Sequence, residues 1–173
     1  LLEHPHVYTF GAAGHSENLL WSEEQLRARG VAVHWVDRGG DVTYHGPGQL
    51  VGYPLLPLPI EGLRIEPDNQ SARMPQADYV GYVRKLEEVL IQALSRLGVT
   101  GQRINGLTGV WVQRRWIASG MAKIAAIGVK VDARGVTRHG FALNVNPEMS
   151  YWQGIIACGL EGSAVTSLEE LPP

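Results

Sequence analysis

Residues 124–145 read IAAIGVKVDARGVTRHGFALNV, two strand-like apolar runs joined by Asp132-Ala133-Arg134-Gly135. A short polar stretch that ends in glycine is typical of the turn between two antiparallel strands. The sequence therefore predicts a β-hairpin here, with strands over 124–131 and 136–145. The segments around this hairpin also favour strands. The hairpin and these segments together indicate the fold class.

The segments outside the hairpin predict further short strands and a few helices. We expect strands over 7–10, 31–36, 49–53 and 110–112, a polar glycine-rich loop over 37–49 and a final short helix over 163–171. Ser22-Glu23-Glu24-Gln25 has the form of a capping box, which predicts a short helix that ends at Gly30. Helices and strands do not alternate as βαβ units. The elements therefore indicate an α+β fold, a mixed and mostly antiparallel sheet with helices packed on it.

The longest predicted helix begins at Tyr79 and ends before Gly98. Its apolar residues are spaced by four, three, four, three and four positions: Tyr79, Val83, Leu86, Leu90, Ala93 and Leu97. This spacing places them on one face of a helix, and such a face is most often part of the core.

Composition restricts the class of protein before any motif is considered. The chain has 173 residues, 45% of them hydrophobic and 18% charged, with a formal net charge of -2. The length favours a single domain over 1–173, and the charge gives no general reason to bind nucleic acid or an anionic membrane. No apolar run approaches the roughly 20 residues of a membrane span. The single cysteine excludes an internal disulfide and allows a reducing compartment.

The densest chemical signal is the loop Arg38-Gly39-Gly40-Asp41-Val42-Thr43-Tyr44-His45-Gly46-Pro47-Gly48-Gln49. Adjacent glycines let backbone N–H groups point at an oxyanion or a carbonyl, with polar side chains around them. Neither a Walker loop nor a Gly-x-Gly-x-x-Gly motif is present, so nucleotide binding is weakly supported. A structural loop held by buried polar side chains remains the alternative.

Cys158 and Lys123 form a candidate pair for nucleophilic chemistry. A thiol is about 3% ionised at pH 7, and a nearby ammonium would raise that fraction. Lys123 is the only charge in the apolar stretch 121–129. The alternatives are an inert buried cysteine and an edge-strand lysine that prevents aggregation. His139 with Cys158 would suggest a Cys–His protease, but the papain-type surroundings are absent, and the histidines lack the spacing of a structural zinc site.

These segments together resemble the octanoyltransferases of lipoate biosynthesis, also called the lipoate-protein ligase B family. The family pattern Arg-Gly-Gly-x-x-Thr-aromatic-His-x-x-x-Gln-x-x-x-Tyr matches from Arg38 to Tyr53. Lys-x-x-x-x-Gly matches 123–128, His-Gly-x-Ala-Leu-Asn matches 139–144, and the Cys-Gly element matches 157–159. Four separated motifs appear in the family's order over most of the chain.

The resemblance implies a biotin/lipoate ligase-like fold and an acyltransferase that needs no cofactor and no metal. Octanoyl-acyl carrier protein would be the donor, and lipoyl domains of 2-oxoacid dehydrogenases and the glycine cleavage H protein would be the acceptors. Cys158 would carry the octanoyl group as a thioester, and Lys123 would lower the pKa of its thiol. The acyl site would be lined by Arg38, Gly39, Gly40, Asp41, Val42, Thr43, Tyr44, His45, Ala126, Ile127, Gly128, His139, Gly140, Phe141 and Ala142. The cytoplasm of a bacterium is the expected location.

The sequence departs from the family pattern at two places. The family has a further strand and helix before the segment that begins at Leu1, so we expect the N-terminal part of the family domain to be missing. The connection between Trp111 and Lys123 is longer than the family's tight turn.

Two other functions stay open. One is an ATP-dependent lipoate or biotin-type ligase, which forms an acyl-adenylate without a cysteine; Gly46-Pro47-Gly48-Gln49 after the histidine favours the transferase instead. The other is a protein-binding module in which Cys158 is merely buried.

Overall fold

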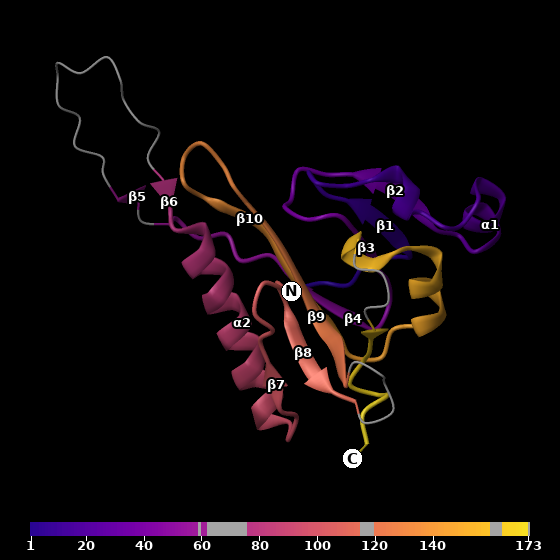
Figure 1. Cartoon of the computed structure of the whole chain (residues 1–173). Coiled ribbons are helices and arrows are strands. Elements are labelled where there is room, and N and C mark those ends of the chain that lie inside the picture. Colours follow the sequence, from indigo (N-terminus) through magenta and orange to yellow (C-terminus); the bar gives the residue numbers. More distant parts are fainter. Residues whose placement is uncertain (59, 62–75, 115–119, 160–163, 173) are drawn as a thin grey trace.

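Two β-sheets meet at the centre of the molecule, and a long helix packs against the larger one (Figure 1). The computed structural model describes residues 1–58, 60–61, 76–114, 120–159 and 164–172. The strands are β1 (Val7–Phe10), β2 (Ala32–Trp35), β3 (Val42–His45), β4 (Gln49–Gly52), β5 (Ile60–Glu61), β6 (Gln76–Ala77), β7 (Gly101–Gln102), β8 (Val110–Gln113), β9 (Met121–Val131), β10 (Thr137–Asn144) and β11 (Ala164–Val165). The α-helices are α1 (Glu23–Ala28) and α2 (Tyr79–Arg96), and the 3-10 helices are η1 (Ser16–Asn18), η2 (Met149–Gly154) and η3 (Ala157–Gly159).

The strand order confirms the predicted fold class. The smaller sheet has the order β2-β1-β3, and the larger has the order β4-β10-β9-β8-β7 with β11 also paired to β9. Within these two sheets, β1–β2 and β9–β11 are parallel and the other named pairs are antiparallel. The parallel β1–β2 pair, joined through α1, is a βαβ-like connection that the sequence analysis did not find.

The hairpin that was predicted from 124–145 is β9–β10, the longest ladder in the larger sheet. Its register extends from Thr137 opposite Val131 to Leu143 opposite Ala125. In the turn, the Asp132 carboxylate accepts hydrogen bonds from the N–H groups of Arg134 and Val136 at 2.8 and 3.0 Å. An aspartate that bonds backbone groups ahead of it stabilises a turn, so the sequence signal had a direct physical basis.

Helix α1 begins with the predicted capping box. The Ser22 hydroxyl accepts from the Gln25 N–H, and the Gln25 amide oxygen accepts from the Ser22 N–H. These two bonds satisfy donors that the first helical turn would otherwise leave without a partner.

Helix α2 has the predicted extent, but its buried face differs from the predicted one. The residues that it buries are Tyr82, Leu86, Glu87, Leu90 and Leu94. Tyr79, Ala93 and Leu97, which the sequence placed on the core stripe, are exposed instead. The face is rotated because α2 packs against β7, β8 and β9 through the row that includes Glu87. A pattern of apolar residues could not identify this buried face of α2, because the face includes the carboxylate of Glu87.

Two predicted segments were wrong. The helix predicted over 163–171 is absent from the described part, residues 164–171, where β11 pairs with Ala122 and Lys123 of β9. The N–H groups of Leu168 and Glu169 then donate to the carbonyls of Asn144 and Val145, so these donors bond the end of β10 and the residue after it rather than a helical turn. In the predicted loop 37–49, residues Val42–His45 form strand β3, which pairs with β1.

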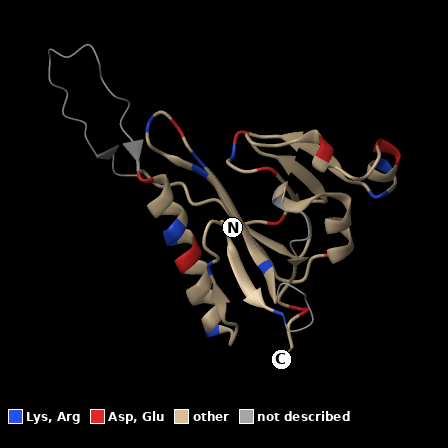
Figure 2. Ribbon diagram, viewed as in Figure 1, with Lys and Arg blue, Asp and Glu red and all other residues tan. Residues whose placement is uncertain are grey.

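Each sheet has its own core, and the two cores differ in character. The core of the smaller sheet contains aromatic residues such as Tyr8, Phe10 and Tyr44. The core between α2 and the larger sheet is aliphatic, with Leu90, Leu94 and others. Charged residues belong mostly to loops and helices, and the sheets are largely uncharged (Figure 2).

Candidate active site

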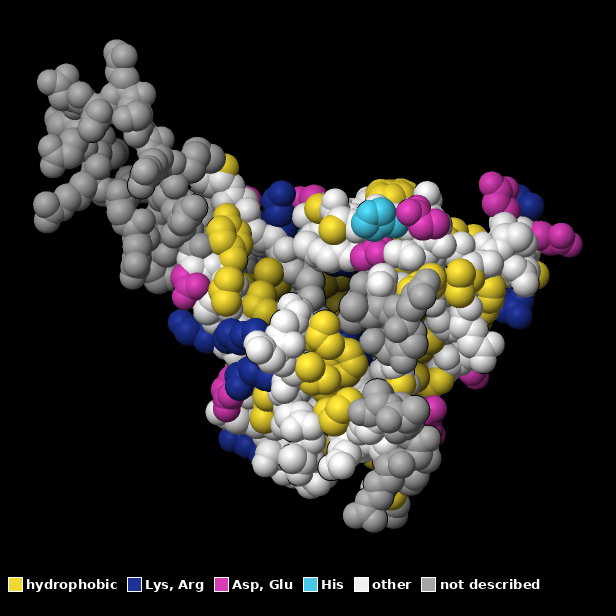
Figure 3. All heavy atoms as spheres, viewed as in Figure 1, with side chains coloured by type: hydrophobic (Ala, Val, Ile, Leu, Met, Phe, Trp, Pro, Cys, Tyr) yellow, Lys and Arg dark blue, Asp and Glu magenta, His cyan; other side chains and the backbone are white. Residues whose placement is uncertain are grey.

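A cavity of about 620 Å³ lies where the two sheets meet. Strands β1–β3 and the loop before β3 form one wall, and β9 and β10 form the other. The segment Gly106–Thr108, just before β8, lines a further part. On the face shown in Figure 3, hydrophobic side chains gather in the middle of the molecule, between α2 and the smaller sheet. The volume falls within the usual range for small-molecule sites, about 300–1,000 Å³.

Most of the candidate residues from the sequence line this cavity. They are Arg38, Gly39, Gly40, Asp41, Thr43, His45, Lys123, Ala126, Ile127, Gly128, His139, Gly140, Phe141 and Ala142. Val42 and Tyr44 do not line it, because side chains alternate along strand β3. Thr43 and His45 face the cavity, whereas Val42 and Tyr44 are fully buried in the aromatic core.

The side chain of Cys158 lies outside the described residues, but its backbone belongs to η3, which packs against β3. The neighbouring Gly159 has a φ of +65°, and a Cβ at this position would lie 2.7 Å from Oδ2 of Asp41. The backbone conformation favours glycine here, and a larger residue would displace the Asp41 carboxylate. This contact places the backbone of η3 beside a residue that lines the cavity.

Lys123 is a buried cation on β9. Its side chain is 8% exposed, and its Nζ lies 4.9 Å from the centroid of the Trp111 ring. Trp111 is also its partner in the ladder between β8 and β9. The face of an indole ring attracts an ammonium group and lowers the cost of burying it. The ladder and the ring thus hold the lysine beside the cavity.

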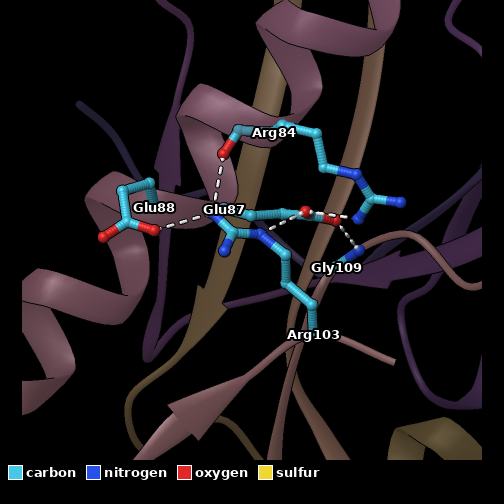
Figure 4. Close-up of polar contacts among 5 residues, drawn as sticks. All are labelled: Arg84, Glu87, Glu88, Arg103 and Gly109. Carbon is cyan, nitrogen blue, oxygen red and sulfur yellow. Dashed lines mark hydrogen bonds and ion pairs between the residues drawn. The ribbon is translucent and has the colours of Figure 1, made fainter. Parts of the chain in front are cut away.

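A buried carboxylate, that of Glu87, fixes the backbone at Gly109 (Figure 4). Glu87 of α2 is fully buried, and its Oε2 accepts from Arg84 at 2.7 Å and from Arg103 at 3.0 Å. Its Oε1 accepts from the Gly109 N–H at 3.1 Å. Gly109 has a φ of +114°, and a Cβ there would lie 3.5 Å from Cε of Lys123. Glu87 therefore ties α2 to the backbone beside the lysine.

Arg38, the first residue of the glycine-rich motif, is buried and has a structural role. Its guanidinium donates to the carbonyl and the hydroxyl oxygen of Thr9 on β1 and to the carbonyl of Gly39. The Gly39 N–H donates to the carbonyl of Val129 on β9 at 2.9 Å. The loop is thereby bonded to both sheets, which keeps the two walls of the cavity together.

His139 joins the two walls at another point. It has a φ of +57°, which is uncommon for a residue other than glycine, and its Nε2 lies 2.7 Å from Oδ1 of Asp37. Arg138 donates to the other oxygen of Asp37 at 3.0 Å. The hydrogen bond from His139, together with the charge of Arg138, lowers the pKa of Asp37. Non-glycine residues with positive φ concentrate at functional sites, in agreement with the position of His139 on the cavity wall.

His45 is a buried polar residue of β3 that lines the cavity. Burial lowers the pKa of His45 to about 4, although the hydrogen bond with Gln49 acts in the opposite direction. The imidazole is therefore neutral near pH 7. Its Nδ1 lies 2.7 Å from Oε1 of Gln49, the motif residue that begins β4.

Sequence reasoning missed several residues that line the cavity. They are His4, Val7, Thr9, His34, Val36, Val51, Val83, Gly106, Leu107 and Thr108. Gly106 and Gly109 flank Leu107-Thr108, and this pair of glycines was the available signal for a backbone that approaches a site closely. The others come from short strands on which no pattern separates a cavity-facing residue from a core residue.

Two features are absent from the described ranges. These ranges contain no group of three or more His, Cys, Asp or Glu side chains that could hold a metal ion. In the same ranges, neither α2 nor any other helix has the length and apolar character needed to cross a bilayer.

The arrangement as a whole suits the binding of an apolar chain next to polar groups. Ala126, Ile127, Phe141 and Ala142 form the apolar part, and Lys123, Thr43 and His45 offer polar groups from β9 and β3. A cavity with one apolar wall and a few polar groups in fixed positions orients a ligand that has an apolar tail and a reactive polar head.

Comparisons with known proteins agree on one family. The family described as the Lipoyl protein ligase A/B catalytic domain matches residues 1–173. The chain is 48% identical to an octanoyltransferase of Chloroflexus aggregans over 97% of its length, and 49% identical to one of Solibacter usitatus over 99%. It covers 67% of each of these relatives, and 64% of a relative in Christiangramia forsetii. The chain thus spans about two thirds of the length of the curated relatives that it matches.

Solved structures show the same fold at low sequence identity. A bi-partite lipoate protein ligase from Thermoplasma acidophilum superposes with a TM-score of 0.66 at 14% identity, over 99% of this chain and 62% of that one. A lipoate-protein ligase A bound with ATP has a TM-score of 0.65 at 15% identity, over 98% and 62%. These neighbours confirm the lipoate ligase-like fold.

Proposed function

This chain belongs to the lipoyl protein ligase A/B family, and from that premise we propose that it is the catalytic part of an octanoyltransferase of lipoate biosynthesis. It would transfer an octanoyl group from acyl carrier protein to a lysine of a lipoyl domain. Support for the substrate comes from the names of relatives that are nearly half identical over almost the whole chain.

One observation carries the proposal beyond family membership. An apolar wall on β9 and β10 and the buried cation Lys123 line the same cavity. The apolar wall would bury an unbranched acyl chain. Each buried methylene group contributes about 0.8 kcal/mol to the free energy of binding. The cation would stabilise the negative charge on sulfur when a thiol becomes a thiolate nucleophile.

The proposed reaction has two steps. The Cys158 thiolate attacks the carbonyl carbon of the carrier thioester, and a new carbon–sulfur bond forms. The bond from the carbonyl carbon to the carrier sulfur breaks, and the carrier leaves as its thiolate. In the second step the amine of the acceptor lysine attacks the acyl-enzyme, a carbon–nitrogen bond forms, and the Cys158 sulfur leaves. The ammonium of Lys123 would stabilise the thiolate in both steps. The position of η3, next to Asp41 and β3, supports the assignment of the nucleophile to this segment.

The donor and acceptors proposed here are those that the family resemblance implies. Octanoyl-acyl carrier protein would supply the acyl group, and lipoyl domains of 2-oxoacid dehydrogenases and the glycine cleavage H protein would receive it. The bacterial cytoplasm would be the site of the reaction.

A pair of assays tests the proposal against its two alternatives. Octanoyl-acyl carrier protein and a lipoyl domain are mixed with the protein without ATP, and free octanoate with ATP replaces the carrier in a parallel sample. Octanoylation of the lipoyl domain in the first sample alone supports a transferase. Product in the second sample alone would establish an ATP-dependent ligase, and binding of the lipoyl domain without product in either would favour a binding module.

A further inference from the structure

A buried series of side-chain amides connects His45 to the part of the sheet that carries Lys123. Oε1 of Gln49 lies 2.7 Å from Nδ1 of His45, and Nε2 of Gln49 lies 2.8 Å from Oδ1 of Asn144. Nδ2 of Asn144 donates to the carbonyl of Thr166 at 2.9 Å, and the Thr166 N–H donates to the carbonyl of Lys123 at 3.0 Å. Gln49 and Asn144 are 1% and 3% exposed, so water does not compete for these bonds.

Backbone carbonyls fix the direction of every hydrogen bond in this series. The carbonyl of Thr166 can only accept, so Asn144 must present its NH₂ group there and its oxygen to Gln49. The carbonyl of Tyr44, 3.1 Å from Nε2 of Gln49, also can only accept, so the NH₂ group of Gln49 donates to both Tyr44 and Asn144. The oxygen of Gln49 is then left to accept from His45. The neutral imidazole therefore carries its proton on Nδ1 and a lone pair on Nε2.

The remaining ring nitrogen belongs to a side chain that lines the cavity. His45 is 8% exposed, and among the described residues only its Nδ1 has a hydrogen-bond partner. Burial lowers the pKa of His45 to about 4, so the ring stays neutral and Nε2 keeps its lone pair at neutral pH. Nε2 is not fully enclosed by protein atoms, so a ligand N–H in the cavity can reach it and donate a hydrogen bond to it.

We propose that Gln49 and Asn144 are positioning residues that hold His45 in the Nδ1–H tautomer, so that its Nε2 accepts a hydrogen bond from the amino group of the acceptor lysine. This inference rests on the proposed function and assigns the place of its second substrate. One N–H of the neutral amine bonds Nε2, which turns the nitrogen lone pair toward the acyl carbonyl carbon. The carbon–nitrogen bond forms, the carbon–sulfur bond to Cys158 breaks, and the proton that leaves nitrogen ends on the departing sulfur. His45 neither gains nor loses a proton.

The tautomer can be measured in the wild-type protein. Long-range ¹H–¹⁵N NMR of the histidine rings at neutral pH distinguishes a protonated from an unprotonated nitrogen. We expect His45 to show a protonated Nδ1 and an unprotonated Nε2, and the signal is assigned by its loss in His45→Gln. A protonated Nε2 in the wild-type protein would overturn the proposal.

The role of Gln49 is tested by separating the two half-reactions. In Gln49→Leu we expect formation of the acyl-enzyme from octanoyl-acyl carrier protein to stay within about twofold of wild type. Transfer from the acyl-enzyme to a lipoyl domain should slow by about 10- to 100-fold. Losses of this size follow when a residue that orients a histidine is removed from metalloproteins, and the geometric argument is the same here. The matched control is Gln92→Leu, because Gln92 is an exposed glutamine on α2. Equal slowing of both half-reactions, or of neither, would contradict the positioning role.

The outcomes also separate this inference from the proposed function. If the wild-type protein forms no octanoyl-lysine in any assay, the proposed function fails and the assignment of the amine to Nε2 fails with it. If transfer occurs but the ring is protonated on Nε2, the proposed function stands and only the inference is wrong.

Discussion

The two walls of the cavity are built in opposite ways. The wall from the smaller sheet presents buried polar groups, among them Arg38, Thr43 and His45, and hydrogen bonds to neighbouring backbone and amide groups fix the arginine and the histidine. The wall from the larger sheet is mostly apolar, with Ile127 and Phe141 as its larger side chains. A polar wall can be positioned to a fraction of an ångström by hydrogen bonds, whereas an apolar wall supplies shape and area. The difference suggests that one sheet orients the reacting groups and the other holds the acyl chain.

Lys123 is the exception to this division, because it is a cation on the apolar wall. We expect Lys123→Met to lower kcat/KM for octanoyl transfer by about 1,000-fold, equivalent to about 4 kcal/mol, since the thiolate loses its counter-charge. Steady-state kinetics with octanoyl-acyl carrier protein and a lipoyl domain measure the effect. Lys130→Met is the matched control, because Lys130 is exposed on the same strand. A loss below tenfold for Lys123→Met would remove the lysine from the chemistry.

Glu87 ties α2 to the segment before β8, which lines part of the cavity. We expect Glu87→Gln to lower the free energy of unfolding by about 3 kcal/mol, because Arg84 and Arg103 lose their buried counter-charge. Urea denaturation followed by circular dichroism measures it. In Glu88→Gln, where the carboxylate is exposed, the loss should not exceed about 1 kcal/mol. Equal losses in the two variants would contradict the role of Glu87 in holding the Gly109 segment.

His45 makes the polar wall sensitive to acid. Its pKa is lowered from 6.5 to about 4 in the folded protein, so between these values the unfolded chain binds the additional proton. The free energy of unfolding therefore falls as the pH falls, by about 2 kcal/mol from this group between pH 7 and pH 5. Urea denaturation at a series of pH values tests this. The His45→Gln variant should lose that part of the slope, and an unchanged slope would contradict the burial of a neutral imidazole.

The apolar wall should determine which chain length fits. We expect Ala126→Leu to reduce the ratio of octanoyl to hexanoyl transfer by about tenfold, because the added carbons occupy space that the longer chain needs. Competition between the two acyl carrier proteins in one reaction measures the ratio. Ala133→Leu, an exposed change in the β9–β10 turn, should leave it unaltered. An unchanged ratio in Ala126→Leu would mean that the chain lies elsewhere.

Much of the fold could be predicted because its signals are local. The turn at Asp132 and the cap at Ser22 each bond their own neighbours in sequence, so their residue types reveal them. The errors arose where distant segments decide the structure. Strand β11 exists because β9 offers it backbone partners, and Glu87 is buried because two arginines and Gly109 bond it.

The candidate site shows the same limit. The family motifs pointed to the residues of β3, β9 and β10, but not to which of them face the cavity. Strand alternation directs Thr43 inward and Tyr44 away, and this requires knowing that the segment pairs with β1. Leu107 and Thr108 reach the cavity through a tertiary contact of α2 with the chain before β8, which no sequence pattern contains.

The most direct test of the account is the intact mass of the protein after it is mixed with octanoyl-acyl carrier protein alone. We expect one octanoyl adduct that hydroxylamine removes and that is absent in Cys158→Ala. A folded wild-type protein without an adduct, or an adduct that persists in Cys158→Ala, would contradict transfer through a thioester at this cysteine.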